Sequence, residues 1–137
     1  MIRCVASSKM SLVKPSVRPR PIARPDAAVA ARTLWLTGYE RSTLGPSLAD
    51  HGARLVQDPH PAQNFFFRSD NINFARRGIV AHTVSSYGLH KEYHTPEDET
   101  RFVDYAHMTD AIRSMVKPIK WLADSKFKPA WLPGKRP

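Results

Sequence analysis

The sequence has 137 residues, of which 42% are hydrophobic, and it carries a formal net charge of +9. A chain of this length can bury one modest core, so we expect one domain in a soluble protein. No apolar run approaches the roughly 20 residues of a membrane-spanning helix, which excludes a protein built on such spans. The single cysteine, Cys4, excludes an internal disulfide and a cysteine-based zinc site.

The positive charge is concentrated at the start of the chain. Residues 1–33 hold seven basic and one acidic residue, a net of +6, whereas residues 34–137 hold fourteen basic and eleven acidic residues, a net of only +3. Four prolines between residues 15 and 25 prevent a long helix or strand, so we predict a disordered basic Pro/Arg-rich leader over 1–33. An organellar transit peptide and a non-native leader from a shifted start or reading frame both fit it, and the second is favoured.

The composition changes at residue 34. The segment "TLWLTGY" alternates large apolar and small polar residues, which predicts a short strand that ends at Gly38. The following "RSTLGPSLADHG" offers Ser42 or Thr43 as an N-cap, two leucines on one face and Gly52 as a stop. It predicts a short helix.

The segment "FFFRSDNINFARRGIVAHTVSS", residues 65–86, predicts a second unit. Ser69 or Asp70 can cap a helix that Gly78 closes, and the β-branched run after Gly78 predicts a buried strand over 79–86. A short helix that leads into a buried strand indicates an α/β layer structure. His82 lies within this strand, and we interpret it as a hydrogen-bonded structural residue.

The segment from Glu99 to about Ser125 predicts a long helix, because its apolar residues keep helical spacing. Pro118 should break or kink it near Lys117, with a second helical segment after the break. The end of the chain, "KFKPAWLPGKRP", predicts an irregular surface segment with Trp131 as the residue that could pin it.

Six histidines are present, and most have an ordinary structural interpretation. His107 lies beside the apolar face of the long helix, and His51 and His60 are expected to be exposed. His90 and His94 share the loop between the predicted strand and the long helix, where α/β proteins tend to keep site residues. Their four-residue spacing would align them only on a helix, which the flanking glycine and proline disfavour, so they form no metal site by themselves.

Several short blocks follow one another at consistent spacing over residues 65–110. In chain order they are Ser69-Asp70, Phe74-Ala75, Gly78-Ile79, Gly88, Tyr93-His94-Thr95, Asp98, and Val103-Asp104-Tyr105 with Met108. Together they resemble the C-terminal part of the zinc-dependent aminopeptidases of metallopeptidase family twenty-eight, the group that includes glutaminyl cyclases and glutamate carboxypeptidases. The resemblance extends over residues 34–137.

The resemblance implies a fold and a set of roles. Residues 34–137 would be the C-terminal portion of a three-layer α/β/α zinc-peptidase domain with a mixed sheet. His94 would be the last zinc ligand of a two-metal centre, and Asp70 would support the active site. Asp98 and the neighbouring Tyr93 would have a structural role or would support the ligand without touching the metal. For Asp98, that role would be to fix the loop or to cap the next helix. Asn71 stands where the family often has a histidine, so no role is carried over to it.

The other metal ligands and the general base of that family are missing from residues 1–64, where Glu40 stands alone, and no Glu-Glu pair occurs anywhere. One ligand of four would contribute on the order of 3–4 kcal/mol, about millimolar affinity, so His94 should not hold zinc tightly. We therefore expect the C-terminal segment of a di-zinc metallo-aminopeptidase, truncated and inactive unless a missing N-terminal half is supplied. In the full-length family the substrate is a peptide.

Two other functions stay open. One is a non-catalytic binding or structural module. The other, less favoured, is a nucleic-acid binder that uses the basic tail, since this tail lacks interleaved aromatic residues. The compartment is also open: relatives are often exported, but no secretory signal is recognisable here. Open sheet edges and an uncovered apolar face should leave the chain marginally stable or prone to association.

Overall fold

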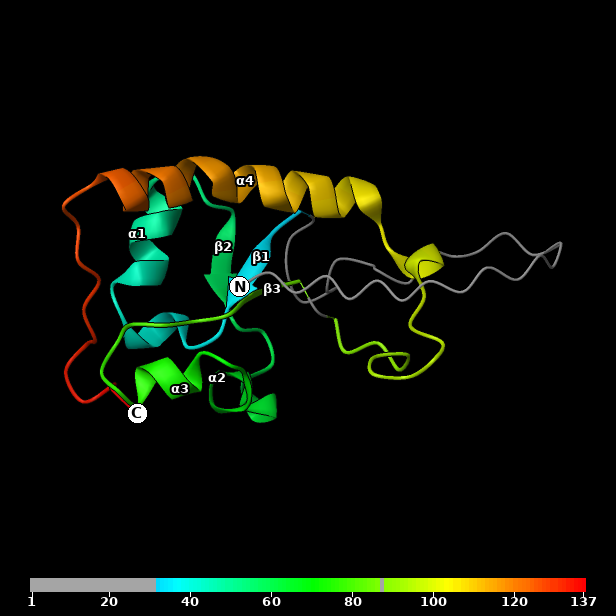
Figure 1. Ribbon diagram of the computed structural model, residues 1–137, viewed down its shortest axis with the longest axis horizontal. Coiled ribbons are helices and arrows are strands. Elements are labelled where there is room, and N and C mark those ends of the chain that lie inside the picture. Colours follow the sequence, from blue (N-terminus) through cyan, green and yellow to red (C-terminus); the bar gives the residue numbers. More distant parts are fainter. Residues whose placement is uncertain (1–31, 87) are drawn as a thin grey trace, which may run out of the picture.

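The computed structural model describes residues 32–86 and 88–137, so most of the predicted leader lies outside the described residues. Its centre is a three-stranded sheet in the order β2-β1-β3, formed by Leu34–Leu36 (β1), Leu55–Gln57 (β2) and Val84–Ser85 (β3) (Figure 1). β1 pairs in parallel with β2 and antiparallel with β3. This mixed sheet with its helices confirms the predicted α/β class. In the part of the chain that is described, no helix has the length and apolar character to cross a membrane.

The middle strand, β1, is buried on both sides. Its two leucines pack into a cluster with residues of α1 (Leu44–Asp50) and α4 (Tyr105–Asp124), among them Met115. Trp35 points the other way, as alternation along a strand requires, and stacks on Phe65 of α2 (Phe65–Arg68) with ring centroids 5.4 Å apart. β1 is therefore the strand around which the helices are arranged.

The first strand and helix follow the prediction closely. Between them lies a 3-10 helix, η1 (Tyr39–Arg41), and after β2 comes another, η2 (Pro61–Gln63). The Ser42 hydroxyl accepts a hydrogen bond from the first backbone amide of α1, on Leu44, at 3.2 Å. Gly52 has φ of +98°, which only glycine adopts easily, so it ends the α1 turn as predicted.

The predicted helix over 69–78 is wrong in its bounds. The structure has two short helices instead, α2 and α3 (Ile72–Ala75), because Ser69 is extended and its hydroxyl donates back to the Phe65 carbonyl at 2.8 Å. The strand expected over 79–86 is reduced to β3, since the neighbouring β1 has only three residues and two of them pair with it.

The predicted break at Pro118 is also wrong: α4 is continuous from Tyr105 to Asp124. A proline inside a helix costs about 3 kcal/mol. Here Pro118 is buried in the same stripe as Ala111 and Met115, so packing against the core outweighs that cost. The helix starts at Asp104, whose side chain accepts from the His107 amide at 2.9 Å, and a separate 3-10 turn, η3 (Thr100–Phe102), precedes it.

The last segment, residues 126–137, is irregular and returns from the end of α4 to the side of α3 (Figure 1). Trp131 pins it, as predicted. Its indole nitrogen donates to the Gly78 carbonyl at 3.0 Å, and its ring lies 5.4 Å from that of His82 and 6.1 Å from that of Phe66.

Candidate metal-ligand loop

His94 lies in the loop that leads from β3 to α4. A series of tight turns shapes this loop: the amide and hydroxyl of Thr95 both donate to the Glu92 carbonyl, at 3.0 and 2.7 Å, and the Asp98 amide donates to Thr95. His94 itself is exposed and has a left-handed backbone with φ of +64°. Its ring lies against Tyr93, with centroids 4.0 Å apart. An imidazole is thus held at the surface by a backbone conformation that is uncommon for a residue other than glycine.

Asp98 interacts within the same loop. One of its carboxylate oxygens lies 3.5 Å from Nε2 of His90, so the pair spans the turn that contains His94. The N-cap of α4 is Asp104 and not Asp98. Of the two structural roles expected for Asp98, fixing the loop is the one that this geometry supports.

Asp70 lies elsewhere in the chain, exposed at the turn between α2 and α3. Figure 1 shows these two helices separated from the loop of residues 88–100. Within 32–86 and 88–137, no three His, Cys, Asp or Glu side chains gather where they could hold a metal ion. The described residues alone therefore do not fit a zinc centre, and the roles of Asp70 and His94 stay predictions.

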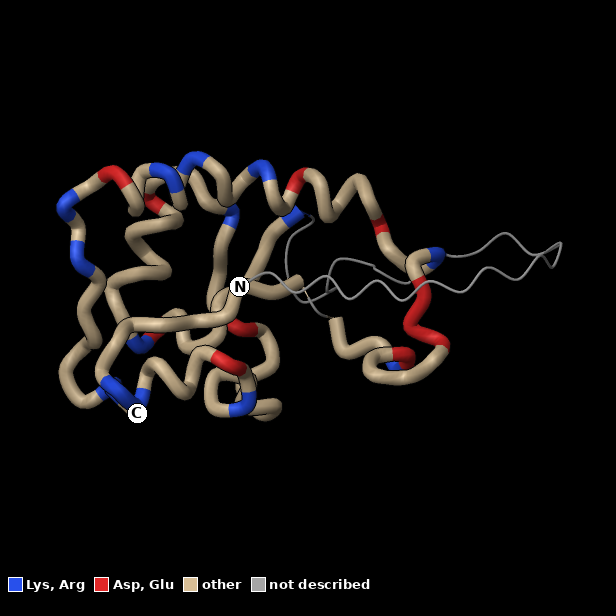
Figure 2. Tube along the Cα trace, viewed as in Figure 1, with Lys and Arg blue, Asp and Glu red and all other residues tan. Residues whose placement is uncertain are grey.

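Glu92 is a residue that the sequence did not single out. It is only 8% exposed, although it lies two residues before His94, and its Oε2 atom has no hydrogen-bond partner among the described residues. The Lys91 ammonium lies 3.8 Å from the other oxygen, Oε1. A buried carboxylate oxygen without a partner is rare and costly, so Glu92 is a further candidate for a ligand-supporting group. Nothing in its local pattern distinguishes it from the exposed acidic residues 97–99, which Figure 2 shows along the stretch before α4.

His82 contrasts with His94. Its Nδ1 lies 2.7 Å from the Thr37 carbonyl, which can only accept, so Nδ1 carries the proton and Nε2 accepts from the Ser42 hydroxyl at 2.7 Å. Burial lowers the pKa of His82, with Arg41 adding to the effect, while the Thr37 bond and Glu40 oppose it. Ser42 is 1% exposed and cannot reach a substrate. The pair is structural, which confirms the interpretation of His82 from sequence.

The remaining histidines are partly as expected. His107 is buried on α4. His51 and His60 were expected to be exposed, and this is wrong for both, since they are half-buried. The His51 ring stacks on Trp121, with centroids 3.4 Å apart, and its Nδ1 lies 2.7 Å from the Ser47 carbonyl.

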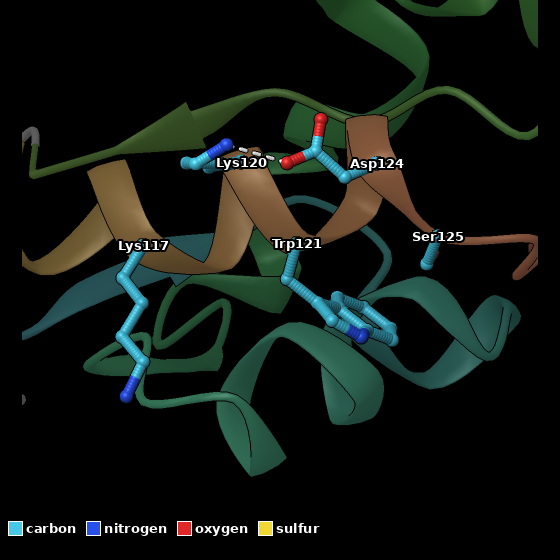
Figure 3. Close-up of a pocket in the computed structure, with 5 residues that line it drawn as sticks. All are labelled: Lys117, Lys120, Trp121, Asp124 and Ser125. Atoms are coloured by element: carbon cyan, nitrogen blue, oxygen red, sulfur yellow. Dashed lines mark hydrogen bonds and ion pairs between the residues drawn. The ribbon is translucent and has the colours of Figure 1, made fainter.

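A surface depression on the C-terminal half of α4 is lined by Lys117, Lys120, Trp121, Asp124 and Ser125 (Figure 3). Lys120 and Asp124 form an ion pair at 2.6 Å, and Trp121 and Lys117 extend from the other side of the helix. The His94 loop joins α4 at the opposite end, and a 20-residue helix is about 30 Å long. This depression therefore takes no part in a site at His94.

These observations define an α/β protein with one exposed, strained histidine in a strand-to-helix loop and an incomplete set of metal ligands. Residues 31–117 match the model of peptidase family M28. The match covers more than half of the chain, and the chain belongs to this family. No curated protein and no solved structure matches it.

Proposed function

We propose that the chain is the C-terminal segment of a zinc-dependent aminopeptidase of family M28. His94 supplies one ligand to a di-zinc centre, and polypeptide outside these 137 residues supplies the remaining ligands and the general base. The observation that carries the proposal is the family match together with the place of His94, exposed and left-handed, in the loop before α4. The substrate is a peptide with a free N-terminus.

The surroundings of His94 support a ligand role. Among the described residues its ring makes a contact with Tyr93 but no hydrogen bond, so a nitrogen lone pair can face a metal. A left-handed conformation costs a non-glycine residue roughly 1–2 kcal/mol, and such strain is common where function fixes a side chain. If His94 had no function, glycine at this position would avoid the cost of positive φ without loss of activity.

The neighbours of His94 hold its loop. Asp98 pairs with His90 across the turn, and Tyr93 packs against the ligand ring. Glu92 offers a buried, unpartnered oxygen two residues away. Asp70 supports the assembled centre from the α2–α3 turn. These are supporting roles, because none of the four is required to touch the metal.

When bound, zinc would polarise the scissile carbonyl and lower the pKa of a bound water. His94 cannot hold it alone: one ligand provides on the order of 3–4 kcal/mol of binding free energy, which corresponds to about millimolar affinity. The 137-residue chain by itself is therefore inactive in peptide hydrolysis.

Hydrolysis of leucine p-nitroanilide tests this proposal. With added zinc, the full chain alone is expected to show no turnover above buffer. Mixed with an N-terminal segment of an M28 aminopeptidase that stops before the position matching residue 31, it should gain turnover that a chelator removes. His94→Ala should abolish this gain, and His60→Ala, whose ring contacts Trp35 and Phe65, should keep it.

Two results would contradict the proposal. Chelator-sensitive turnover by the isolated chain that disappears in His94→Ala would show a complete site within these residues. Full turnover of the His94→Ala mixture would show that this imidazole is no ligand.

A non-catalytic binding module is the second candidate. It is favoured by a single observation: Ile112, Val116 and Ile119 of α4 are large apolar residues that no described residue buries. This observation is also compatible with the first proposal.

A further inference from the structure

Helix α4 has an apolar side that nothing in the described structure covers. Ile112, Val116 and Ile119 are 41%, 60% and 48% exposed, although they are branched aliphatic residues. Together with Met115, Lys120 and Ala123 they line a groove that is almost wholly apolar. We call the strip of Ile112, Val116, Ile119 and Ala123 the α4 flank.

The position of the α4 flank around the helix indicates what kind of structure fits it. Successive residues turn by about 100°, so these four positions form one line about 16 Å long, beside the buried line of Ala111, Met115 and Pro118. On the opposite side of α4, Trp121 stacks on His51 at the end of α1. One side of α4 therefore has a neighbouring helix, and in the part of the chain that the structure describes no helix lies on the flank, where another could pack in the same layer.

Charge distinguishes the possible occupants. Arg113 lies at the outer border of the flank, and no ion pair of Arg113 occurs among the described residues; Lys120 is paired with Asp124. The basic residues follow the outside of α4 in Figure 2. In a second copy of this chain, residues 34–137 also carry a net positive charge, of +3, so two copies docked through this surface would bring like charges together. An occupant with acidic residues beside its apolar strip would be attracted.

The flank also leads towards the candidate site. The loop that carries His94 leads through η3 into the N-terminus of α4. Three further large apolar residues are exposed along this path: Leu89 at 40%, Tyr93 at 49% and Tyr105 at 56%. A polypeptide bound to the flank would therefore extend to the loop of His94, where the proposed metal centre needs further ligands.

We propose that the α4 flank docks a helix of the polypeptide that supplies the remaining metal ligands, a helix with an apolar strip and an acidic border facing Arg113. This inference rests on the function proposed above, and it adds the surface and the chemistry of the partner. The flank is the contact that places the partner's ligands beside His94.

The binding experiment uses the full 137-residue chain and the M28 N-terminal segment described above, measured by sedimentation velocity and calorimetry. Val116→Asp should weaken the complex at least 30-fold, because a charge would be buried at the contact. Arg113→Glu should weaken it by roughly tenfold through loss of charge complementarity. Ala106→Asp is the matched control: it adds the same charge at an exposed position on another side of α4, and it should leave the affinity unchanged. Circular dichroism shows that each variant has kept its helix content.

Three results would overturn the docking proposal. The first is a complex whose affinity does not change in Val116→Asp. The second is self-association of the chain that Val116→Asp removes, which would make a second copy the occupant. The third is binding to phosphatidylserine vesicles through the flank with no affinity for the segment, which would make it a lipid-binding face.

Zinc separates this proposal from the function on which it rests. If the complex forms through the flank but binds zinc equally well with His94→Ala, docking stands and the ligand role falls. If zinc-dependent turnover survives Val116→Asp unchanged, the ligand role stands and the flank is not the docking surface.

Discussion

The sheet-centred part of this chain and the loop of residues 88–100 each contain a candidate histidine, His82 and His94, and the two have opposite environments. Around β1, His82 is half-buried and held by two hydrogen bonds of 2.7 Å, one to Ser42 and one to the Thr37 carbonyl. In the loop, His94 is exposed, has φ of +64° and contacts only the ring of its neighbour Tyr93 among the described residues. The His82 imidazole links the segment before β3 to Thr37 and Ser42 by hydrogen bonds. The His94 residue has a left-handed backbone, and its ring makes no hydrogen bond among the described residues.

The difference between the contacts of His82 and those of His94 indicates which region is held by its own packing. In the sheet-centred part, Trp131 and His82 connect the chain end, β1 and the segment before β3 into one packed unit. Buried polar atoms without a partner occur in both regions among the described residues: Oε2 of Glu92 in the loop, the indole nitrogen of Trp35 in β1 and both ring nitrogens of His107 on α4. The feature that distinguishes the loop is therefore the exposed, left-handed His94, and departures from local rules of this kind are typical of functional sites.

Removing Trp35 is the most severe test of the comparison. This side chain is 2% exposed and stacks on Phe65, so Trp35→Ala should lower the free energy of unfolding by about 3–5 kcal/mol. Leu89→Ala, in the loop and 40% exposed, should lower it by about 0.5 kcal/mol or less. Urea titration followed by far-UV circular dichroism measures both. Similar losses at the two positions would mean that the loop is as much a part of the core as β1.

The buried Ser42–His82 pair should give the next largest effect. Ser42→Ala leaves Nε2 of His82 without its donor and the Leu44 amide without its acceptor, at a cost of about 1–3 kcal/mol. Ser86→Ala, at an exposed position, is the matched control and should stay within about 0.5 kcal/mol of the parent. The same urea titration compares them. An unchanged midpoint for Ser42→Ala would show that the pair contributes nothing to folding.

The sequence predicted the parts of the fold that local signals determine. Alternation marked β1, Gly52 marked the end of α1, and helical spacing marked α4. It did not predict that α4 continues through Pro118, because the deciding contribution is burial against Ala111 and Met115, which depends on tertiary packing. For the same reason β3 is shorter than its β-branched run: a strand extends only as far as its neighbour.

Less of the candidate site could be predicted from the sequence. The place of His94 between a strand and a helix was visible in the pattern, and so was the ordered set of motifs that the family match later confirmed. The burial of Glu92 was not visible, because an acidic residue between Lys91 and Tyr93 has the pattern of a surface loop. Whether Asp70 and His94 act together depends on polypeptide that would bridge them, which a motif cannot encode.

A substitution at position 94, where the backbone is left-handed, should increase stability, whereas the substitutions of Trp35 and Ser42 should decrease it. His94→Gly should raise the free energy of unfolding by about 0.5–1 kcal/mol, because glycine removes the steric cost of positive φ but loses more entropy on folding. Lys91→Gly, in the same loop but without positive φ, should instead lower it by a similar amount. Chemical denaturation of the two variants side by side is sufficient. A loss of stability in His94→Gly would mean that the imidazole has a structural role like that of His82.

The pH dependence of stability should show the smallest effect, since the Thr37 bond partly offsets the influence of burial on the pKa of His82. A lowered pKa in the folded state means that the unfolded chain binds the proton first as pH falls. Stability should therefore be complete above about pH 6.5, the usual histidine pKa, and decline as pH falls from there through the folded-state pKa. Thermal melts between pH 5 and 8 should show this decline in the parent and in the matched control His94→Gln. In His82→Gln the decline should flatten. Glutamine does not bind a proton in this pH range, so the unfolded variant no longer takes up a proton at this position that the folded chain lacks. If His94→Gln flattened the curve instead, the exposed ring and not the buried one would carry the folded state's sensitivity to acid.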